Sequence, residues 1–228
     1  EEANTWVGTR AATVVGIFVA LEQPQPQVPE FLNALRSAGY VPWMAMLSSL
    51  SLEQLASGAY DSAIRTSARQ LVGHASVYVS LLPEMNGRWF SYYGSPDLYQ
   101  QVYRRLRALF QAEGVTATWV FAPNGWSMVG DEFELYFPGG DAVDIVALSA
   151  YNFGACYPGV DWQNFDVMAR SYLDRARNFG KPVWLDTGTL EAGGDKDAWL
   201  RDLFDQARAY PLQGVLYFNL VTESMATL

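Results

Sequence analysis

Cysteine and histidine are nearly absent from this sequence of 228 residues, which holds one of each, Cys156 and His74. A single cysteine cannot form an intramolecular disulfide, and neither residue has a second Cys or His at the spacing of a metal site. A disulfide scaffold and a Cys/His zinc site are therefore excluded. We expect structural roles for both residues and neither a metal nor an organic cofactor.

Charge is also scarce, since only 17% of the residues are charged, and Lys plus Arg (15) against Asp plus Glu (24) gives a net charge of −9. The one basic cluster, Arg104, Arg105 and Arg107, falls on the polar face of an expected helix, which is more typical of a solvated surface than of a phosphate-binding stripe. Nucleic acid is therefore not an expected partner. No run approaches the roughly 20 apolar residues of a membrane span, and no signal peptide is visible, which leaves the compartment open.

Hydrophobic residues, in contrast, make up half of the chain, and 14% of the residues are aromatic. A chain of this composition can bury a large core, which excludes disordered and collagen-like classes. The length suits one α/β barrel. We therefore expect a single (β/α)-barrel domain over residues 1–228.

The order of the expected elements supports this fold class, because short apolar runs alternate with amphipathic helical stretches. Several of these runs are almost continuously apolar, as in a parallel sheet covered on both faces. Seven strands are expected, at Thr13 to Leu21, Val41 to Leu47, Ser76 to Leu82, Thr116 to Asn124, Val143 to Tyr151, Pro182 to Gly188 and Gly214 to Leu220. Helices are expected at residues 28–39, at 52–58 after a Ser51 capping box with Gln54, and at 61–71, 96–113, 164–179 and 195–210.

Polar and aromatic residues follow the ends of these strands. In a parallel barrel all strand ends share one rim, so residues far apart in sequence converge there. The expected site is a cleft at this rim, which would collect Glu84, Asn86 and Trp89, then Asn124 and Trp126, then Tyr151 and Asn152, and finally Asp186 and Asn219.

The stretch LLPEMNGRWF carries the clearest chemistry, because it places Glu84 at the end of an apolar strand and Asn86 and Trp89 in the next loop. A carboxyl group beside an amide and an indole is suited to protonating a glycosidic oxygen while the indole stacks on a sugar. A carboxylate that caps the next helix is an equally good interpretation of this motif alone.

The motif PEMNGRW resembles the acid/base loop of glycoside hydrolase family 26, the β-mannanase family of the (β/α)-barrel glycosidases. Other pieces resemble that family in the same order, from about Gly39 to Asn219: SGAYDSAIRTSARQL, TWVFAPNGW, YFPGGDAVDIVALSAYN, KPVWLDTGTLEAGGDKDAWLRD and GVLYFNL. The resemblance implies a retaining endo-glycanase on a β-linked polysaccharide, most often mannan, and an extracellular or cell-surface location.

By the same resemblance, Glu84 would be the general acid/base, and Asn86 and Trp89 would line the nearest sugar subsite. Tyr151 would hold the nucleophile by its hydroxyl group, and Tyr92, Asn124 and Trp126 would form subsite walls. Each aromatic residue could instead pack inside the barrel, and this is the favoured interpretation for Trp43 and Trp119, which lie within apolar runs.

The sequence departs from the family at the nucleophile. The family has Glu at the end of the strand that corresponds to PVWLDTG, where this chain is one residue shorter and offers Asp186 or Thr187. The family also has an Arg four residues before the acid/base and often a His immediately before it, where this chain has Ser80 and Pro83. Loss of the Arg removes part of the charge that would keep the nucleophile ionised. Other carboxylates rank below Asp186 because they lie in loops rather than at strand ends: Glu132, Glu134, Glu191, Asp195 and Glu223.

These departures keep a second hypothesis open, namely a catalytically impaired barrel that binds carbohydrate or serves as a structural subunit of a larger assembly. The count of seven strands points the same way, because a closed barrel has eight. By the resemblance, the strand at Thr13 to Leu21 corresponds to the second strand of the family. We therefore expect the first βα unit to be missing, truncated, or replaced by a partner protein or by the segment Asn4 to Arg10.

Overall fold

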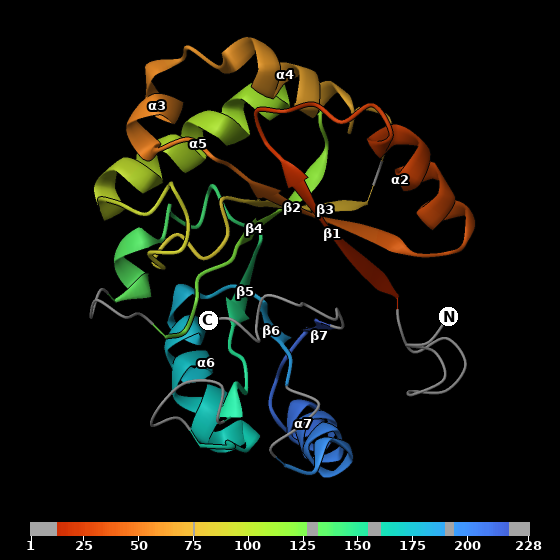
Figure 1. The fold of residues 1–228 in the computed structure, drawn as a ribbon, viewed down its shortest axis with the longest axis vertical. Coiled ribbons are helices and arrows are strands. Elements are labelled where there is room, and N and C mark those ends of the chain that lie inside the picture. Colours follow the sequence, from red (N-terminus) through yellow and green to blue (C-terminus); the bar gives the residue numbers. More distant parts are fainter. Residues whose placement is uncertain (1–12, 75, 127–131, 155–160, 190–193, 219–228) are drawn as a thin grey trace.

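The computed structural model describes residues 13–74, 76–126, 132–154, 161–189 and 194–218 (Figure 1). Its centre is one sheet of seven parallel strands in sequence order, which confirms the expected (β/α)-barrel class in a truncated form. The strands are β1 (Val14–Ala20), β2 (Val41–Leu47), β3 (Val77–Leu81), β4 (Ala117–Phe121), β5 (Ile145–Ser149), β6 (Val183–Thr187) and β7 (Gly214–Tyr217).

Helices cover the outer face of this curved sheet, and the crossovers between successive strands carry them there (Figure 1). They are α2 (Val28–Ser37), α3 (Leu52–Ser57), α4 (Asp61–Arg69), α5 (Pro96–Ala112), η1 (Phe133–Tyr136), α6 (Ser171–Ala176) and α7 (Lys196–Ala209). The expected capping box at the start of α3 is confirmed, because Gln54 N donates to Ser51 Oγ and Ser51 N donates to Gln54 Oε1. The single helix expected at 164–179 is instead a π-helical turn (Asp166–Arg170), α6 and a 3₁₀ turn (Arg177–Phe179).

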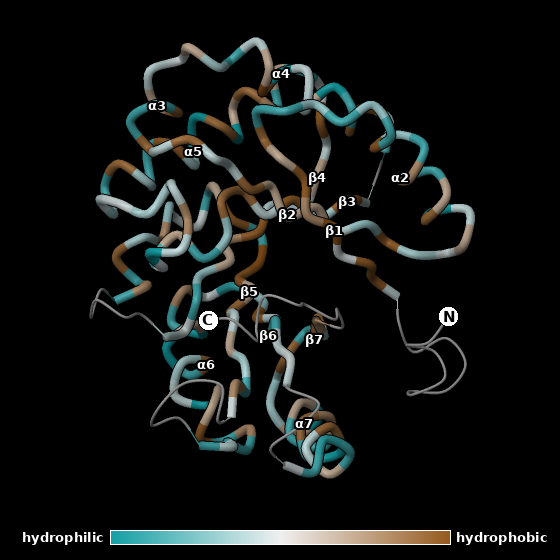
Figure 2. Tube along the Cα trace, in the orientation of Figure 1, coloured by the Kyte–Doolittle hydropathy of each residue, from teal (hydrophilic) through white to brown (hydrophobic). Residues whose placement is uncertain are grey.

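Strand alternation divides the side chains of the sheet between two faces. Outward residues such as Val79 and Leu185 pack beneath the helices in the main core, and Figure 2 shows hydrophobic residues concentrated in the strands. Inward residues Trp43, Tyr78 and Trp184 form a separate aromatic cluster, with ring centroids 5.1–5.6 Å apart. Burial of Trp43 and Trp119 confirms that these two tryptophans pack in the core.

The sheet is open, because among the described residues β1 and β7 each pair with a single neighbour. Phe18 on β1 is 55% exposed, and its ring lies 6.2 Å from that of Phe218 across the opening. The segment Asn4 to Arg10, expected as one substitute for the first strand, lies outside the described residues, as do Cys156 and Asn219.

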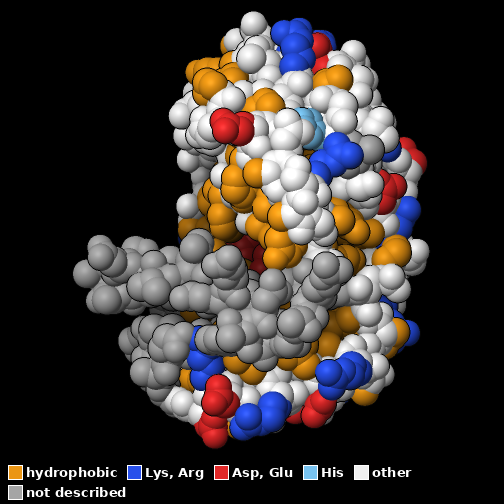
Figure 3. Space-filling model, turned by 90° about the vertical axis from the view of Figure 1, so that its right-hand side faces the viewer, with side chains coloured by type: hydrophobic (Ala, Val, Ile, Leu, Met, Phe, Trp, Pro, Cys, Tyr) orange, Lys and Arg blue, Asp and Glu red, His pale blue; other side chains and the backbone are white. Residues whose placement is uncertain are grey.

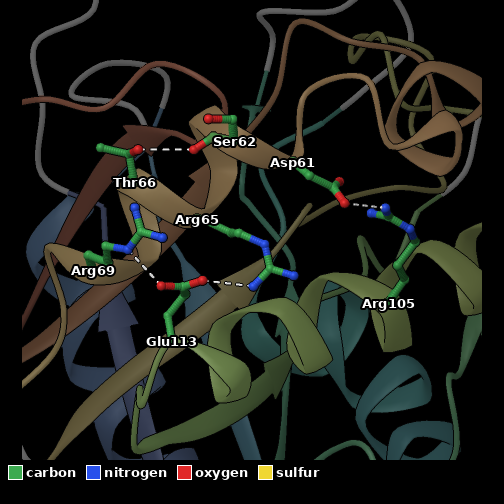
Figure 4. Close-up of polar contacts among 7 residues, drawn as sticks. All are labelled: Asp61, Ser62, Arg65, Thr66, Arg69, Arg105 and Glu113. Atoms are coloured by element: carbon green, nitrogen blue, oxygen red, sulfur yellow. Dashed lines mark hydrogen bonds and ion pairs between the residues drawn. The ribbon is translucent and has the colours of Figure 1, made fainter.

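The arginine cluster of α5 lies on the outer helical layer and is occupied by carboxylates and an aromatic ring. Arg105 binds Asp61 at 2.6 Å, as Figure 4 shows, and Arg104 binds Asp141 at 2.6 Å. Arg107 lies over the ring of Trp119. Nearby, Glu113 accepts hydrogen bonds from both Arg65 and Arg69 (Figure 4). These contacts fit the expected solvated face. No described helix is long and apolar enough to cross a membrane.

Candidate active site

The candidate active site lies on the rim formed by the carboxyl ends of the strands. The row begins at Glu84 after β3, whose backbone N–H donates to Ala122 O, and continues to Asn124 after β4. A parallel bridge joins Asn124 to Ser149 at the end of β5, and Ser149 is in register with Asp186 on β6. Parallel pairing thus brings residues from four strands into one row, as the sequence predicted for Glu84, Asn124 and Asp186.

Glu84 owes its position to an unusual backbone. Leu82 and Glu84 have φ values of 51° and 54°, in the left-handed region that side chains with a Cβ rarely adopt. Such conformations persist only where surrounding contacts impose them. Here Leu82 N donates to Met46 O. Pro83, which lies between Leu82 and Glu84, accepts a hydrogen bond at its backbone oxygen from the hydroxyl group of Tyr92, at 2.8 Å. The sharp turn after β3 fixes the carboxyl group at the rim.

Both carboxyl oxygens of Glu84 accept hydrogen bonds. Trp89 Nε1 donates to Oε2 at 2.9 Å, and Asn124 Nδ2 donates to Oε1 at 3.0 Å. Burial raises the pKa of Glu84, and the donors Ser149, Trp89 and Asn124 oppose this effect. A carboxyl group with a raised pKa is suited to hold a proton for a leaving group near neutral pH.

Asp186 faces Glu84 from β6 and has a different environment. The one hydrogen bond that its carboxyl group accepts in the described part of the chain comes from the hydroxyl group of Tyr151, at 2.8 Å to Oδ1. Burial and the negative charge of Glu84 together raise the pKa of Asp186 to about 7, against the opposing effect of the bond from Tyr151. Because each carboxyl group lies within the other's electrostatic field, their titrations are coupled.

The choice between Asp186 and Thr187 is decided by where their side chains point. Thr187 is fully buried, and its hydroxyl group donates to Ala150 O at 2.6 Å. Asp186 lies on the opposite, inward face with its carboxyl group against Tyr151. Asp186 is thus the residue that the strand presents to the rim.

The other expected site residues divide into exposed and buried groups. Trp89 and Trp126 are 43% and 50% exposed, so their rings are available to a ligand. Asn86 is buried, and its amide exchanges two hydrogen bonds with the backbone of Asn124. Tyr92 is 0% exposed and stacks on Phe90, so it supports the loop from below and offers no free face as a subsite wall.

The alternative carboxylates that the structure describes form contacts away from the site. Glu132 and Glu134 bind Arg175, and Asp195 caps α7 by accepting from Ala198 N. Glu191 and Glu223 lie outside the described residues. Within the described ranges, no three His, Cys, Asp or Glu residues gather as metal ligands.

Ser149 is the site residue that the sequence reasoning missed. It lies in the row between Asn124 and Asp186, and its hydroxyl group opposes the rise in the pKa of Glu84. The signal that could have found it is its place two residues before Tyr151, on the same inward side of the strand.

Removal of the indole N–H beside Glu84 should shift the titration of this carboxyl group. Trp89→Phe keeps an aromatic ring but deletes the donor to Oε2, so the bond that favours the ionised form is lost and the pKa of Glu84 should rise. We expect the pH above which activity falls to move upward. Measurement of kcat/KM against pH in both proteins checks this, with Trp126→Phe as the control because no Trp126 indole bond to Glu84 is present. An unchanged profile would contradict the assignment of Glu84 as the acid.

Comparisons with known proteins agree with this geometry. The sequence matches the profile of Glycosyl hydrolase family 26 over residues 25–172. Among curated proteins, none is significantly similar to this chain. Three similar solved structures are a family 26 β-mannanase from Bacteroides ovatus, GH26C from a Muricauda species, and a β-mannanase from Streptomyces thermolilacinus solved with mannohexaose.

The Bacteroides ovatus enzyme superposes with a TM-score of 0.69 at 16% identity, covering 93% of this chain and 73% of its own. The Muricauda protein superposes with a TM-score of 0.63 at 15% identity, covering 91% of this chain and 71% of its own. The Streptomyces enzyme superposes with a TM-score of 0.59 at 14% identity, covering 98% of this chain and 75% of its own. At these identities the likeness concerns the fold alone. The profile, in contrast, spans more than half of the sequence, including the loop of Glu84 and the strand of Tyr151. The chain belongs to glycosyl hydrolase family 26.

Proposed function

We propose that this glycoside hydrolase-like protein is a retaining endo-glycanase that cleaves a β-linked polysaccharide in the manner of a β-mannanase. The observation that carries the proposal is the pair of carboxyl groups on one rim, Glu84 and Asp186. Each accepts hydrogen bonds from its own donors, and the negative charge of Glu84 raises the pKa of Asp186. Retaining hydrolysis needs such a pair on opposite sides of the anomeric carbon.

In the first step, Asp186 Oδ2 attacks the anomeric carbon while Glu84 gives its proton to the glycosidic oxygen, so that the C–O bond to the leaving sugar breaks. The product is a glycosyl ester on Asp186. In the second step, Glu84 takes a proton from a water molecule that attacks the same carbon and releases Asp186. Tyr151 holds Asp186 in place, and the rings of Trp89 and Trp126 would stack on sugars beside the cleaved bond.

The working state needs one proton on the pair, with Glu84 protonated and Asp186 ionised. Burial and the negative charge of Glu84 raise the pKa of Asp186 to about 7, so the free pair holds a proton on Asp186 below that pH, and turnover needs this proton on Glu84 once the substrate is bound. A polysaccharide substrate also implies an extracellular or cell-surface location, since such polymers do not cross membranes.

The test is incubation with manno-, gluco- and xylo-oligosaccharides, with NMR detection of the first anomer formed. Release of shorter sugars as the β-anomer supports the proposal, whereas first appearance of the α-anomer would exclude retention. The short side chain of Asp186 favours a second function, binding without turnover. Millimolar or tighter binding without cleavage in the same assay would establish that function.

A further inference from the structure

Gly87 lies in the loop of Glu84, two residues before Trp89, and its backbone conformation does not require a glycine. It is not among the glycines with a positive φ, so a residue with a Cβ could adopt the same dihedral angles. Glycine is needed either for a left-handed φ or where another group must approach the backbone closely. Only the second reason applies to Gly87.

The group that approaches Gly87 is the indole ring of Trp89. A Cβ placed on Gly87 would overlap three contiguous ring atoms, Cζ2, Cε2 and Cη2, to a similar degree. An atom beside the edge of a ring meets one or two ring atoms closely, whereas an atom over its face meets several. The face of the indole therefore covers Gly87. Cε2 is bonded to Nε1, the atom that donates to Glu84 Oε2 at 2.9 Å, so the contact lies directly beside the donor.

The backbone of Gly87 is held in place, so a side chain added there would move the ring. Gly87 N donates to Glu84 O at 2.9 Å and closes the turn that carries the carboxyl group. The preceding residue, Asn86, is buried and exchanges two hydrogen bonds with the backbone of Asn124. Trp89, in contrast, is 43% exposed and has room to move. Carbon atoms in contact lie about 3.5–4.0 Å apart, so the indole would shift by more than about 1 Å, which breaks a hydrogen bond of this length.

The bond from Trp89 matters because Glu84 is buried. Burial raises the pKa of Glu84, and the groups that oppose the rise are Ser149, Trp89 and Asn124. A parallel bridge fixes Ser149 and Asn124 to each other, whereas Trp89 lies in a loop. From the side of β1, Figure 3 shows an acidic patch recessed between hydrophobic side chains. In such surroundings each donor to a carboxyl group has a large effect, because hydrogen bonds are stronger where water is excluded.

We propose that Gly87 is a positioning residue for the acid: because it has no side chain, the face of the Trp89 indole lies on its backbone, and this contact aims Nε1 at Glu84. The inference rests on the proposed function in so far as Glu84 is the acid. Gly87 touches neither the substrate nor the carboxyl oxygens and acts through Trp89 alone.

The experiment follows the indole N–H signals of the full chain by ¹⁵N NMR from pH 4 to 9. The sequence holds 8 Trp residues, and the signal that is lost in Trp89→Phe identifies Trp89. In the original protein this signal should move with the ionisation of Glu84, and in Glu84→Gln the movement should disappear. In Gly87→Ala the movement should fall to less than about a third, because the bond that couples the two groups is broken. Full movement in Gly87→Ala would overturn the proposal.

Gly16→Ala is the matched control. Gly16, on β1, also has no positive φ, and a Cβ there would meet nothing within 4 Å. This variant should leave the Trp89 signal and its movement unchanged. An equal loss of movement in Gly16→Ala and Gly87→Ala would show a general effect of the added methyl group and would also overturn the proposal.

A second pair of variants keeps the test decisive if Gly87→Ala folds poorly. Trp89→Ala removes the ring that the added methyl group would meet, so Gly87→Ala should leave the melting temperature of Trp89→Ala unchanged. A further loss of stability in this double variant would mean that the methyl group meets something other than Trp89, which contradicts the proposal.

Activity gives a second readout. Addition of Gly87→Ala to Trp89→Phe, which already lacks the donor, should change kcat/KM by less than about twofold at every pH, because the two substitutions act on one bond. A further shift of the pH profile would overturn the proposal. Turnover with an unchanged Trp89 signal in Gly87→Ala would sink this inference and leave the proposed function standing. Absence of turnover with the expected loss of the signal's movement would do the reverse, since the signal reports the bond without catalysis.

Discussion

Glu84→Gln is expected to lower kcat on a polysaccharide by about 10²- to 10⁴-fold, the range typical for loss of a general acid. Glutamine fills the same space and keeps an oxygen for Trp89 or Asn124, but it carries no proton that a glycosidic oxygen could take. Folding should therefore survive while bond cleavage fails. The measurement is kcat by reducing-sugar release together with the melting temperature of both proteins.

The leaving group separates acid catalysis from a merely structural effect. A dinitrophenyl glycoside departs without protonation, so its first step should be nearly as fast in Glu84→Gln as in the original protein, and a burst should precede a slow second step that lacks a base. The matched control is Glu113→Gln, on the outer layer between Arg65 and Arg69, which should leave kcat unchanged. If polysaccharide and dinitrophenyl glycoside lost activity equally, Glu84 would not be the acid.

Much of the fold could be predicted because its signals are local. Apolar runs bounded by turn residues mark all seven strands, and Ser51 with Gln54 marks the start of α3. The common rim then follows from parallel order alone, which is why Glu84, Asn124 and Asp186 could be brought together in advance.

The side chains within the site were harder to predict because their directions depend on backbone details. Asn86 and Tyr92 fall in the expected loop, yet the left-handed turn at Leu82 and Glu84 directs both into the interior, where they hold that loop. Ser149 is an ordinary small residue in an apolar run, and only the bridge from β4 shows that it lies between the two carboxyl groups.

Asp186→Asn is expected to stabilise the protein above neutral pH and to abolish any activity. The pKa of Asp186 is about 7 in the folded protein, against about 3.9 in an unfolded chain. Between these values the folded state binds a proton that the unfolded state does not, so the free energy of unfolding falls as pH rises from about 4 to about 7 and is level beyond. This decline amounts to about 4 kcal/mol for a difference of this size, and asparagine, which cannot ionise, removes it.

Urea unfolding at pH 4, 6 and 8 measures the decline, which should be steep in the original protein and shallower in Asp186→Asn, where part of it remains because burial also raises the pKa of Glu84. Asp141→Asn should instead lower the free energy of unfolding above about pH 4. Arg104 lowers the pKa of Asp141 to about 2, so this carboxylate stabilises the fold above about pH 4 and loses its effect as pH falls towards 2. Parallel curves for the original protein and Asp186→Asn would mean that Asp186 ionises as a hydrated carboxylate does. A confirmed difference would mean that the fold keeps a charge at a cost to its own stability, which is the pattern expected of a residue retained for function.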